Sequence, residues 1–334
     1  MKKIFLAVVA LAAMTACEND EMVRYDKGAT IGFSNAFIDN ATRTAIDGSH
    51  TTAELSSFQV YGAVEGPTTG TFVNIFSNVE VTKEAKAATD IHGEDANGVA
   101  NTWYYAEGHV QYWVPGKDYK FAAVVDAVVS EAAAPGEMPT KLTVDATAQK
   151  DALYASHTVD NYGGTVTNVA FTFRHILSKV KFSAVVAEMA PAYTYKVSGI
   201  KIIGAADGGV YTIGAATPWA PNATTYDPEF GNIVETATAE GAAAVALNNK
   251  TLESNYSRLL VPQTITKISC VVELYKGNDL ISRETKTIEP TGGVALAEGC
   301  SYNFVLNLAA PGAPITFSAE AVNTWGADNN VNVL

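Results

Sequence analysis

Basic residues are scarce in this chain, which has 22 lysines and arginines against 35 aspartates and glutamates among 334 residues. The formal net charge is −13 at pH 7. No nucleic-acid partner is expected, because binding to phosphates requires clustered lysine and arginine. The acidity instead favours a soluble surface on which like charges repel.

Motifs of catalysis and metal binding are also missing. The sequence holds no zinc-binding helix with two histidines, no phosphate-binding glycine loop and no serine elbow. The histidines are not spaced as ligands on one element; they are His50, His92, His109, His157 and His175. Carboxylates are numerous, so spacing alone leaves open a pair of the kind that glycosidases use. We expect a protein that is not an enzyme and has no cofactor or metal, and we interpret His175 as a hydrogen-bonded structural residue.

Cysteine occurs only three times, and the first copy follows a short apolar run. Lys2 and Lys3 precede the apolar stretch 4–13, which is too short to span a membrane and is typical of a signal peptide, here residues 1–16. The following Thr15-Ala16-Cys17 resembles a bacterial lipobox, although Met14 stands where leucine is usual. That resemblance implies a lipoprotein acylated at Cys17, with palmitate among its chains, and several chains make a lasting anchor. The alternative is an ordinary signal peptide with an incidental cysteine.

The other two cysteines, Cys270 and Cys300, stand at inward positions of expected strands. They could pair across strands in an oxidising compartment. Two buried free thiols are the interpretation we favour.

Alternation of apolar and polar residues recurs along the chain and predicts half-buried strands. Clear examples are residues 119–125, 268–274 and 302–308, and glycine-rich turns such as 115–118 and 276–279 separate such runs. Helix candidates are few, the best being residues 145–155. The fold class expected is all-β, with sandwiches of short strands.

The length favours two domains. The apolar strand 169–173 runs into Ile176 and Leu177 and then into the strand 180–186, without a long linker. We therefore predict an N-terminal domain over residues 17–175 and a C-terminal domain over residues 176–334, packed end to end.

Several stretches, taken in order, resemble the fimbrillin (Mfa-like, type V pilin) lipoprotein family of Bacteroidetes. Besides the lipobox, they are Trp103-Tyr104-Tyr105, Tyr112-Trp113, Tyr119-Lys120-Phe121, Asp151-Ala152-Leu153-Tyr154-Ala155, residues 171–180, Leu260-Val261-Pro262-Gln263-Thr264, residues 299–308, and Ile315 and Phe317 with Trp325. Each motif alone has a packing explanation, so the resemblance depends on their order along the whole chain.

This resemblance implies two tandem transthyretin-like antiparallel β-sandwich domains and a structural subunit of a cell-surface fimbrium, or pilus. Such subunits reach the outer membrane as lipid-anchored precursors, and a trypsin-like protease then removes the first strand. A strand from another pilin subunit fills the vacated groove, which joins the subunits into a polymer that serves cell adhesion. The acidic residues 18–21 resemble the export signal for the outer face of that membrane, and the alternative is a solvated linker.

Two segments fit the two roles in strand exchange. Ile31, Phe33 and Phe37 alternate as a removable strand should, and the polar loop 39–49 that follows holds Arg43. Cleavage there would release a pro-segment, residues 18–43, and leave Thr44 as the new N-terminus. The alternative is that Arg43 is an ordinary loop residue. Arg24 precedes the strand, so a cut there would open no groove.

The donor strand is expected at the C-terminus. Residues 315–325 either supply it or complete the second sandwich. The final residues Val331, Val333 and Leu334 are the better donor candidate, because an apolar tail at a chain end is unusual.

A rival hypothesis is a surface lipoprotein that binds glycan or host protein without polymerising. Tryptophans stack on sugar rings, and the four are Trp103, Trp113, Trp219 and Trp325. Trp219, between Pro218 and Pro221, is the one expected in a loop, whereas core packing better explains Trp103 and Trp113.

Overall fold

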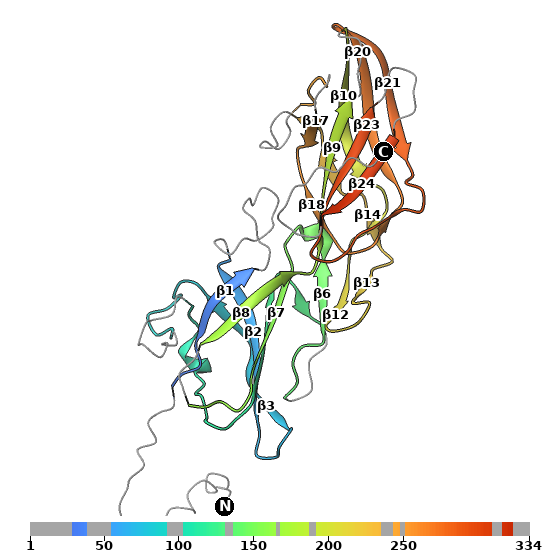
Figure 1. The fold of residues 1–334 in the computed structure, drawn as a ribbon. Helices are drawn as coiled ribbons and strands as arrows, with labels where there is room; N and C mark the ends of the chain where they lie inside the picture. The colour runs from blue at the N-terminus through green and yellow to red at the C-terminus, as the bar shows by residue number, and fades with distance from the viewer. Residues whose placement is uncertain are drawn as a thin grey trace, which may run out of the picture.

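The computed structural model describes residues 29–38, 55–91, 103–130, 136–164, 168–186, 192–234, 243–247, 251–308 and 316–322. For residues 35, 37, 38 and 316–322 it describes the backbone alone. The molecule is elongated, with the hairpin of β20 and β21 at one end and β3 towards the other (Figure 1). Nearly all its regular structure is strand, so the all-β prediction is confirmed.

One six-stranded sheet is built from the first half of the chain. In spatial order its strands are β1 (Phe33–Ile38), β8 (Val169–His175), β7 (Leu153–Val159), β4 (Tyr119–Val125), β2 (Ser57–Glu65) and β3 (Phe72–Thr82). On β8 every second residue is buried, from Val169 to His175, as the apolar alternation predicts. Residues 107–109 form a single 3₁₀ turn, η1 (Glu107–His109).

Two larger sheets are built from the second half. One contains β15 (Glu229–Gly231), β10 (Tyr193–Ile202), β20 (Ile268–Lys276) and β21 (Asp279–Ile288), in that order. The other contains β16 (Ile233–Val234), β17 (Thr251–Ser254), β9 (Ser178–Val186), β23 (Ser301–Leu308) and β24 (Thr316–Val322), with β18 (Arg258–Leu260) also paired to β9. Gly277 and Asn278 make the predicted tight turn between β20 and β21.

A smaller sheet joins the two halves. Its order is β13 (Trp219–Pro221), β12 (Gly208–Thr212), β6 (Lys141–Asp145) and β5 (Val128–Val129). Strand β6 comes from the first half and β12 from the second, and the two pair antiparallel along their full lengths. Two short pairs complete the fold: β11 (Ala205–Ala206) with β14 (Thr225–Tyr226), and β19 (Thr264–Ile265) with β22 (Val294–Ala295).

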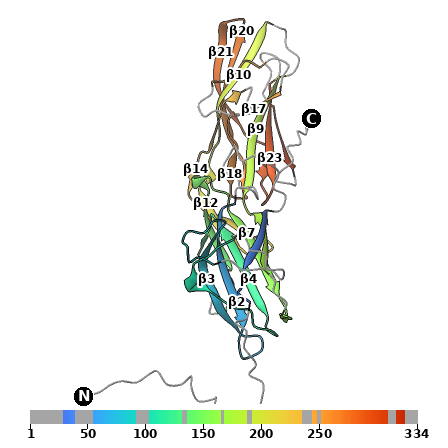
Figure 2. The same cartoon turned by 90° about the vertical axis from the view of Figure 1, so that its left-hand side faces the viewer.

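Three clusters of buried apolar side chains correspond to this arrangement. One draws only on residues 31–173 and another only on residues 180–308. The third lies between them and mixes Leu142 and Val144 of β6 with Tyr211 of β12 and with Ile176 and Leu177. In the view turned by 90°, the two main sets of strands lie one above the other (Figure 2). The domain division at residues 175 and 176 stays a prediction, and the third cluster lies across it.

Hydrogen bonds of one glutamine reinforce the connection between the halves. The Gln149 side-chain amide donates to the Leu259 carbonyl and its oxygen accepts from the Leu259 amide, both at 3.0 Å. The same Nε2 also donates to the Ala146 carbonyl at 2.7 Å. Gln149 therefore ties the η2 (Ala146–Ala148) turn of the first half to β18 of the second.

The helix expected over residues 145–155 is wrong. Only the η2 turn forms there, and the Asp145 carboxylate caps it by accepting from the Thr147 amide at 2.8 Å. Gln149 adopts a left-handed conformation, and β7 begins at Leu153. Burial of Leu153 between neighbouring strands outweighs the modest helical preference of the segment.

Two other expectations need correction. The sandwiches are not purely antiparallel, because β1 pairs parallel with β8 and β23 pairs parallel with β9. Parallel pairing suits strands that are far apart in sequence, since it needs a long connection. Moreover, β23 is not half-buried: Asn303 and Val305, expected to face solvent, are 6% and 4% exposed.

Both cysteines of the second half are free thiols in the structure. Cys270 is buried, and burial raises its pKa to about 11. Cys300 is half-buried, and burial together with the nearby charge of Glu298 raises its pKa.

Gly208 should contribute to the stability of the sheet that joins the halves. A Cβ at this position would lie 2.3 Å from the Val144 carbonyl oxygen, so Gly208→Ala must push β6 and β12 apart. We expect a cost of about 1–3 kcal/mol in the free energy of unfolding, visible as a lower Tm in calorimetry. Gly163→Ala is the matched control, because a Cβ there meets nothing within 4 Å. An equal Tm for the two variants would contradict this role.

The thiols should differ in reactivity. The thiolate is the nucleophile, so in a folded chain without residues 1–17 an aromatic disulfide reagent at about pH 8 should modify Cys300 slowly and Cys270 only after unfolding. The released chromophore should therefore correspond to at most one thiol per chain, reacting slowly, before denaturant is added and to two thiols per chain afterwards. Rapid modification of both thiols in the folded chain would contradict the burial of Cys270.

Candidate functional site

Strand β1 lies at the edge of the first sheet and has one neighbour in it, β8. The pairing is parallel, with Phe33 beside Val169 and Ile38 beside Phe173, and a bulge interrupts it between Ser34 and Phe37. Parallel pairs are slightly less stable per residue than antiparallel ones. The pairing of β1 is therefore of the less stable kind and is interrupted by the bulge.

The residues just before β1 are hydrogen-bonded on both sides. The Ile31 amide donates to the Gln111 carbonyl at 2.8 Å, and the Trp113 amide donates to the Ala29 carbonyl at 2.9 Å. On the other side, the Val169 amide donates to the Gly32 carbonyl at 2.8 Å. Residues 29–32 thus bridge residues 111–113 and the start of β8.

The side chain of Phe33 fills a pocket made of aromatic rings. It is fully buried, and its ring centroid lies 5.5–6.1 Å from those of Phe58, Phe76, Tyr105 and Phe171. Three of these contacts are edge-to-face and the one with Phe171 is stacked, which are the favoured geometries for aromatic pairs. We call the space occupied by residues 29–38 the β1 groove, with these four rings at its base.

Tyr105 fixes the start of the groove. Its hydroxyl donates to the Ile31 carbonyl at 2.6 Å. Burial raises the pKa of Tyr105 far above its usual value, so the hydroxyl remains protonated and keeps donating at any physiological pH. The hydrogen bond therefore requires a backbone carbonyl at this position of the strand and does not depend on which side chain that residue carries.

Strand β1 is strongly buried, yet it pairs with only one strand of its sheet. Ile31 and Phe33 are fully buried, which contributes roughly 3–6 kcal/mol. Because β1 is an edge strand, its departure breaks no pairing between other strands. It would leave an apolar groove bordered by the unpaired backbone of β8, and such an edge is a template for the addition of another strand.

Only part of the predicted site lies among the described residues. Ile31 and Phe33 occupy the groove as expected, and the backbone of Phe37 lies in β1. Cys17, Arg24, Arg43, Thr44, Val331, Val333 and Leu334 lie outside the described residues, so their roles stay predictions. The backbone of residues 316–322 forms β24 and pairs antiparallel with β23, completing that sheet.

Three of the four tryptophans lie among the described residues. Trp103 and Trp113 are buried in the aromatic core, which confirms the packing interpretation, and Trp325 lies outside the described part. Trp219 is on the short strand β13 rather than in a loop, and its side chain is half-buried. It lines a cavity at the junction of the halves.

His175 is structural, as interpreted. Its Nδ1 lies 2.9–3.0 Å from the Asp151 carboxylate, and both side chains are buried. Within the described ranges no group of three or more His, Cys, Asp or Glu side chains could hold a metal ion. No helix in this part of the chain is long and apolar enough to cross a membrane.

Sequence reasoning missed the base of the groove. Phe58, Phe76 and Tyr105 come from three separate segments, and their convergence on Phe33 is a property of the folded sheet. The one signal available was the inward position of Phe58 and Phe76 in alternating runs, which does not say which strand they face.

Comparisons with known proteins give a family through a sequence model and a fold through a solved structure. A family model described as fimbrillin-like matches residues 42–325. The crystal structure of a fimbrial protein from Bacteroides vulgatus has a TM-score of 0.57 at 14% identity, covering 88% of this chain and 99% of that one. Candidate cell adhesion proteins from Bacteroides uniformis and Bacteroides ovatus reach TM-scores of 0.45 each at 14% and 16% identity, covering 89% and 90% of this chain and 99% and 98% of theirs. No curated protein sequence gives a match.

Truncation of Phe33 should loosen β1. Phe33→Ala leaves a cavity between four rings, and we expect a loss of about 3–5 kcal/mol in the free energy of unfolding, measured with urea. Hydrogen exchange of the Val169 amide, which is bonded to Gly32, should accelerate in the same variant. The control is Val73→Ala in β3, where Val73 is 53% exposed and the change should stay within about 0.5 kcal/mol. Equal costs for the two variants would refute a central role for Phe33.

Proposed function

This chain belongs to the fimbrillin-like family, whose model matches it from residue 42 to residue 325, and we propose that it is a fimbrial subunit assembled by replacement of strand β1. Family membership supports a structural surface protein and not an enzyme. The single observation that carries the strand-exchange part is the position of β1: an edge strand whose buried Phe33 closes an aromatic groove.

The proposed trigger is cleavage after Arg43. This residue follows Ile38, the last residue of β1, by five positions, so the cut would separate the complete strand from the body of the protein. The released segment, residues 18–43, would then be held only by the groove contacts. A cut after Arg24 would leave β1 covalently attached, which is why it is not the proposed site.

The proposed donor is the C-terminal tail of another subunit. The backbone of β24 is already paired with β23, which favours residues beyond it as the donor. In an extended strand, Val331 and Val333 would share one face, as Ile31 and Phe33 do, so the sequence of the tail offers the same spacing of apolar residues. A contact between one molecule's groove and the next molecule's tail does not close on itself, so it would extend into a filament.

The remaining partners follow from this role. We propose that diacylglycerol and palmitate on Cys17 hold the precursor at the outer membrane facing outward, and that a trypsin-like protease of the cell surface releases it. Adhesion would then be a property of the fimbrium. The division into domains 17–175 and 176–334 is part of the same proposal, with the groove in the first domain and the last sheet strand in the second.

Limited trypsin treatment tests the proposal. The purified chain from residue 18 should be cut after Arg43, which mass spectrometry would detect as a new N-terminus at Thr44, and an unboiled gel should then show a ladder. Arg43→Ala should keep β1 attached to the body of the protein and stay monomeric, even if trypsin trims residues before β1, whereas the matched variant Arg24→Ala should behave as the unmodified chain does. A chain lacking residues 331–334 should be cut but should not form the ladder. Cleaved protein that stays monomeric would refute strand exchange, and a ladder from the shortened chain would refute the donor.

A further inference from the structure

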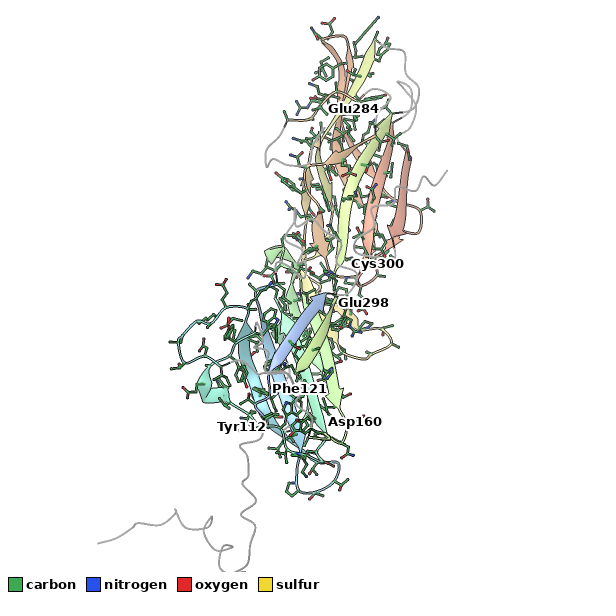
Figure 3. The ribbon with its side chains drawn as sticks, turned by 60° about the vertical axis from the view of Figure 1, so that its left-hand side comes forward. Tyr112, Phe121, Asp160, Glu284, Glu298 and Cys300 are labelled. Carbon is green, nitrogen blue, oxygen red and sulfur yellow. The ribbon has the colours of Figure 1, made fainter. Side chains whose placement is uncertain are left out.

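A cavity of about 530 Å³ lies where the two halves meet. Its walls come from the end of β8, from β12 and β13, from residues 214–218 between them, and from residues 262 and 296–298. Figure 3 shows Glu298 between the upper and the lower sets of strands. The volume falls within the range of about 300–1,000 Å³ that is usual for small-molecule sites.

One wall of the cavity is aromatic. The rings of Tyr211 and Trp219 lie 5.3 Å apart at an interplanar angle of 57°. The Trp219 Nε1 donates to the Ile176 carbonyl at 2.9 Å, which fixes the orientation of the indole. Tyr211 is buried and Trp219 is half-buried, so an oriented apolar surface borders the cavity.

Arg174 and Glu298 supply the polar groups of the cavity. Arg174 Nη2 donates to the Tyr211 hydroxyl at 2.9 Å. Glu298 also lines the cavity, and its half-buried side chain is hydrogen-bonded to Tyr211. Burial, together with the charge and the hydrogen bond of Glu298, raises the pKa of Tyr211 to about 12. A carboxylate can accept about four hydrogen bonds, so Glu298 has acceptor capacity beyond its bond to Tyr211.

The chemistry of a ligand follows from these groups. Arg174 and Glu298 carry opposite charges, so together they favour neither an anion nor a cation, and a neutral ligand suits the pair. The Glu298 carboxylate can accept from a hydroxyl or amide donor, and Arg174 offers N–H groups to an acceptor. The aromatic wall requires a flat apolar face. A pyranose ring unites these three properties, since it has hydroxyl groups around its rim and C–H groups on its faces.

We propose that this cavity is a glycan-binding site for one or two neutral pyranose units, with Trp219 as the stacking platform, Glu298 as the hydrogen-bond acceptor and Arg174 as the donor. The site is formed without the β1 groove, so it does not depend on strand exchange. It would give a fimbrial subunit its own adhesive contact along the body of the molecule.

Binding of simple sugars to the uncleaved chain tests the proposal. The probes are the methyl glycosides of glucose, galactose, mannose and N-acetylglucosamine, compared with anionic N-acetylneuraminic acid and cationic glucosamine, all followed by saturation-transfer NMR. At least one neutral glycoside should bind saturably with a Kd of about 1 mM or tighter. Absence of saturable binding by all four neutral glycosides, or binding of a charged probe alone, would overturn the proposal.

Variants locate the binding. Trp219→Ala and Glu298→Gln should each weaken it, the first by about tenfold or more because the stacking surface is lost. Glu284→Gln makes the same chemical change on the exposed strand β21 and should leave binding unchanged. Because Trp219 also bonds to Ile176, Ala216→Trp provides an independent variant that fills the mouth of the cavity from an exposed position. Undiminished affinity in Glu298→Gln and Ala216→Trp would place the sugar elsewhere and refute the site.

Discussion

Burial of Phe33 among four aromatic rings is the interaction on which the first half of the molecule depends. The strand that carries it has a single neighbour in its sheet, so a strong apolar contact is made by an element that topology leaves removable. These two properties seldom coincide, because well-buried strands usually lie in the middle of a sheet. The apolar groove is covered only when a strand occupies it, and this requirement is the basis of the proposed exchange with a strand of another molecule.

The junction between the halves has a different character. Here β6 and β12 share a backbone ladder, Gly208 allows the close approach to Val144, and Gln149 adds paired hydrogen bonds to Leu259. A backbone ladder is stiffer than a contact between two surfaces, because a hinge would have to break several hydrogen bonds together. In the proposed filament, such a junction would resist bending between the halves of a subunit.

The groove and the cavity meet on one strand. Phe173 of β8 pairs with Ile38 of β1, and the next residue, Arg174, lines the cavity. Strand β8 thus pairs with β1 along most of its length, and its last residues lie at the junction between the halves. The buried pair of His175 and Asp151 follows directly and anchors this end of β8 to the start of β7.

The sequence by itself determined the all-β class, the strand positions of residues 119–125 and 268–274, the inward side of Phe33 and the core role of Trp113. These features follow from local alternation and turn chemistry, which a linear pattern contains in full. Only the tertiary structure decided that residues 145–155 form a turn and a strand, that β1 runs parallel to β8, and that Trp219, Arg174 and Glu298 border one cavity. Such outcomes depend on contacts between segments that are distant in the chain, where the free energy of burial overrides local preference and no local pattern specifies the partner.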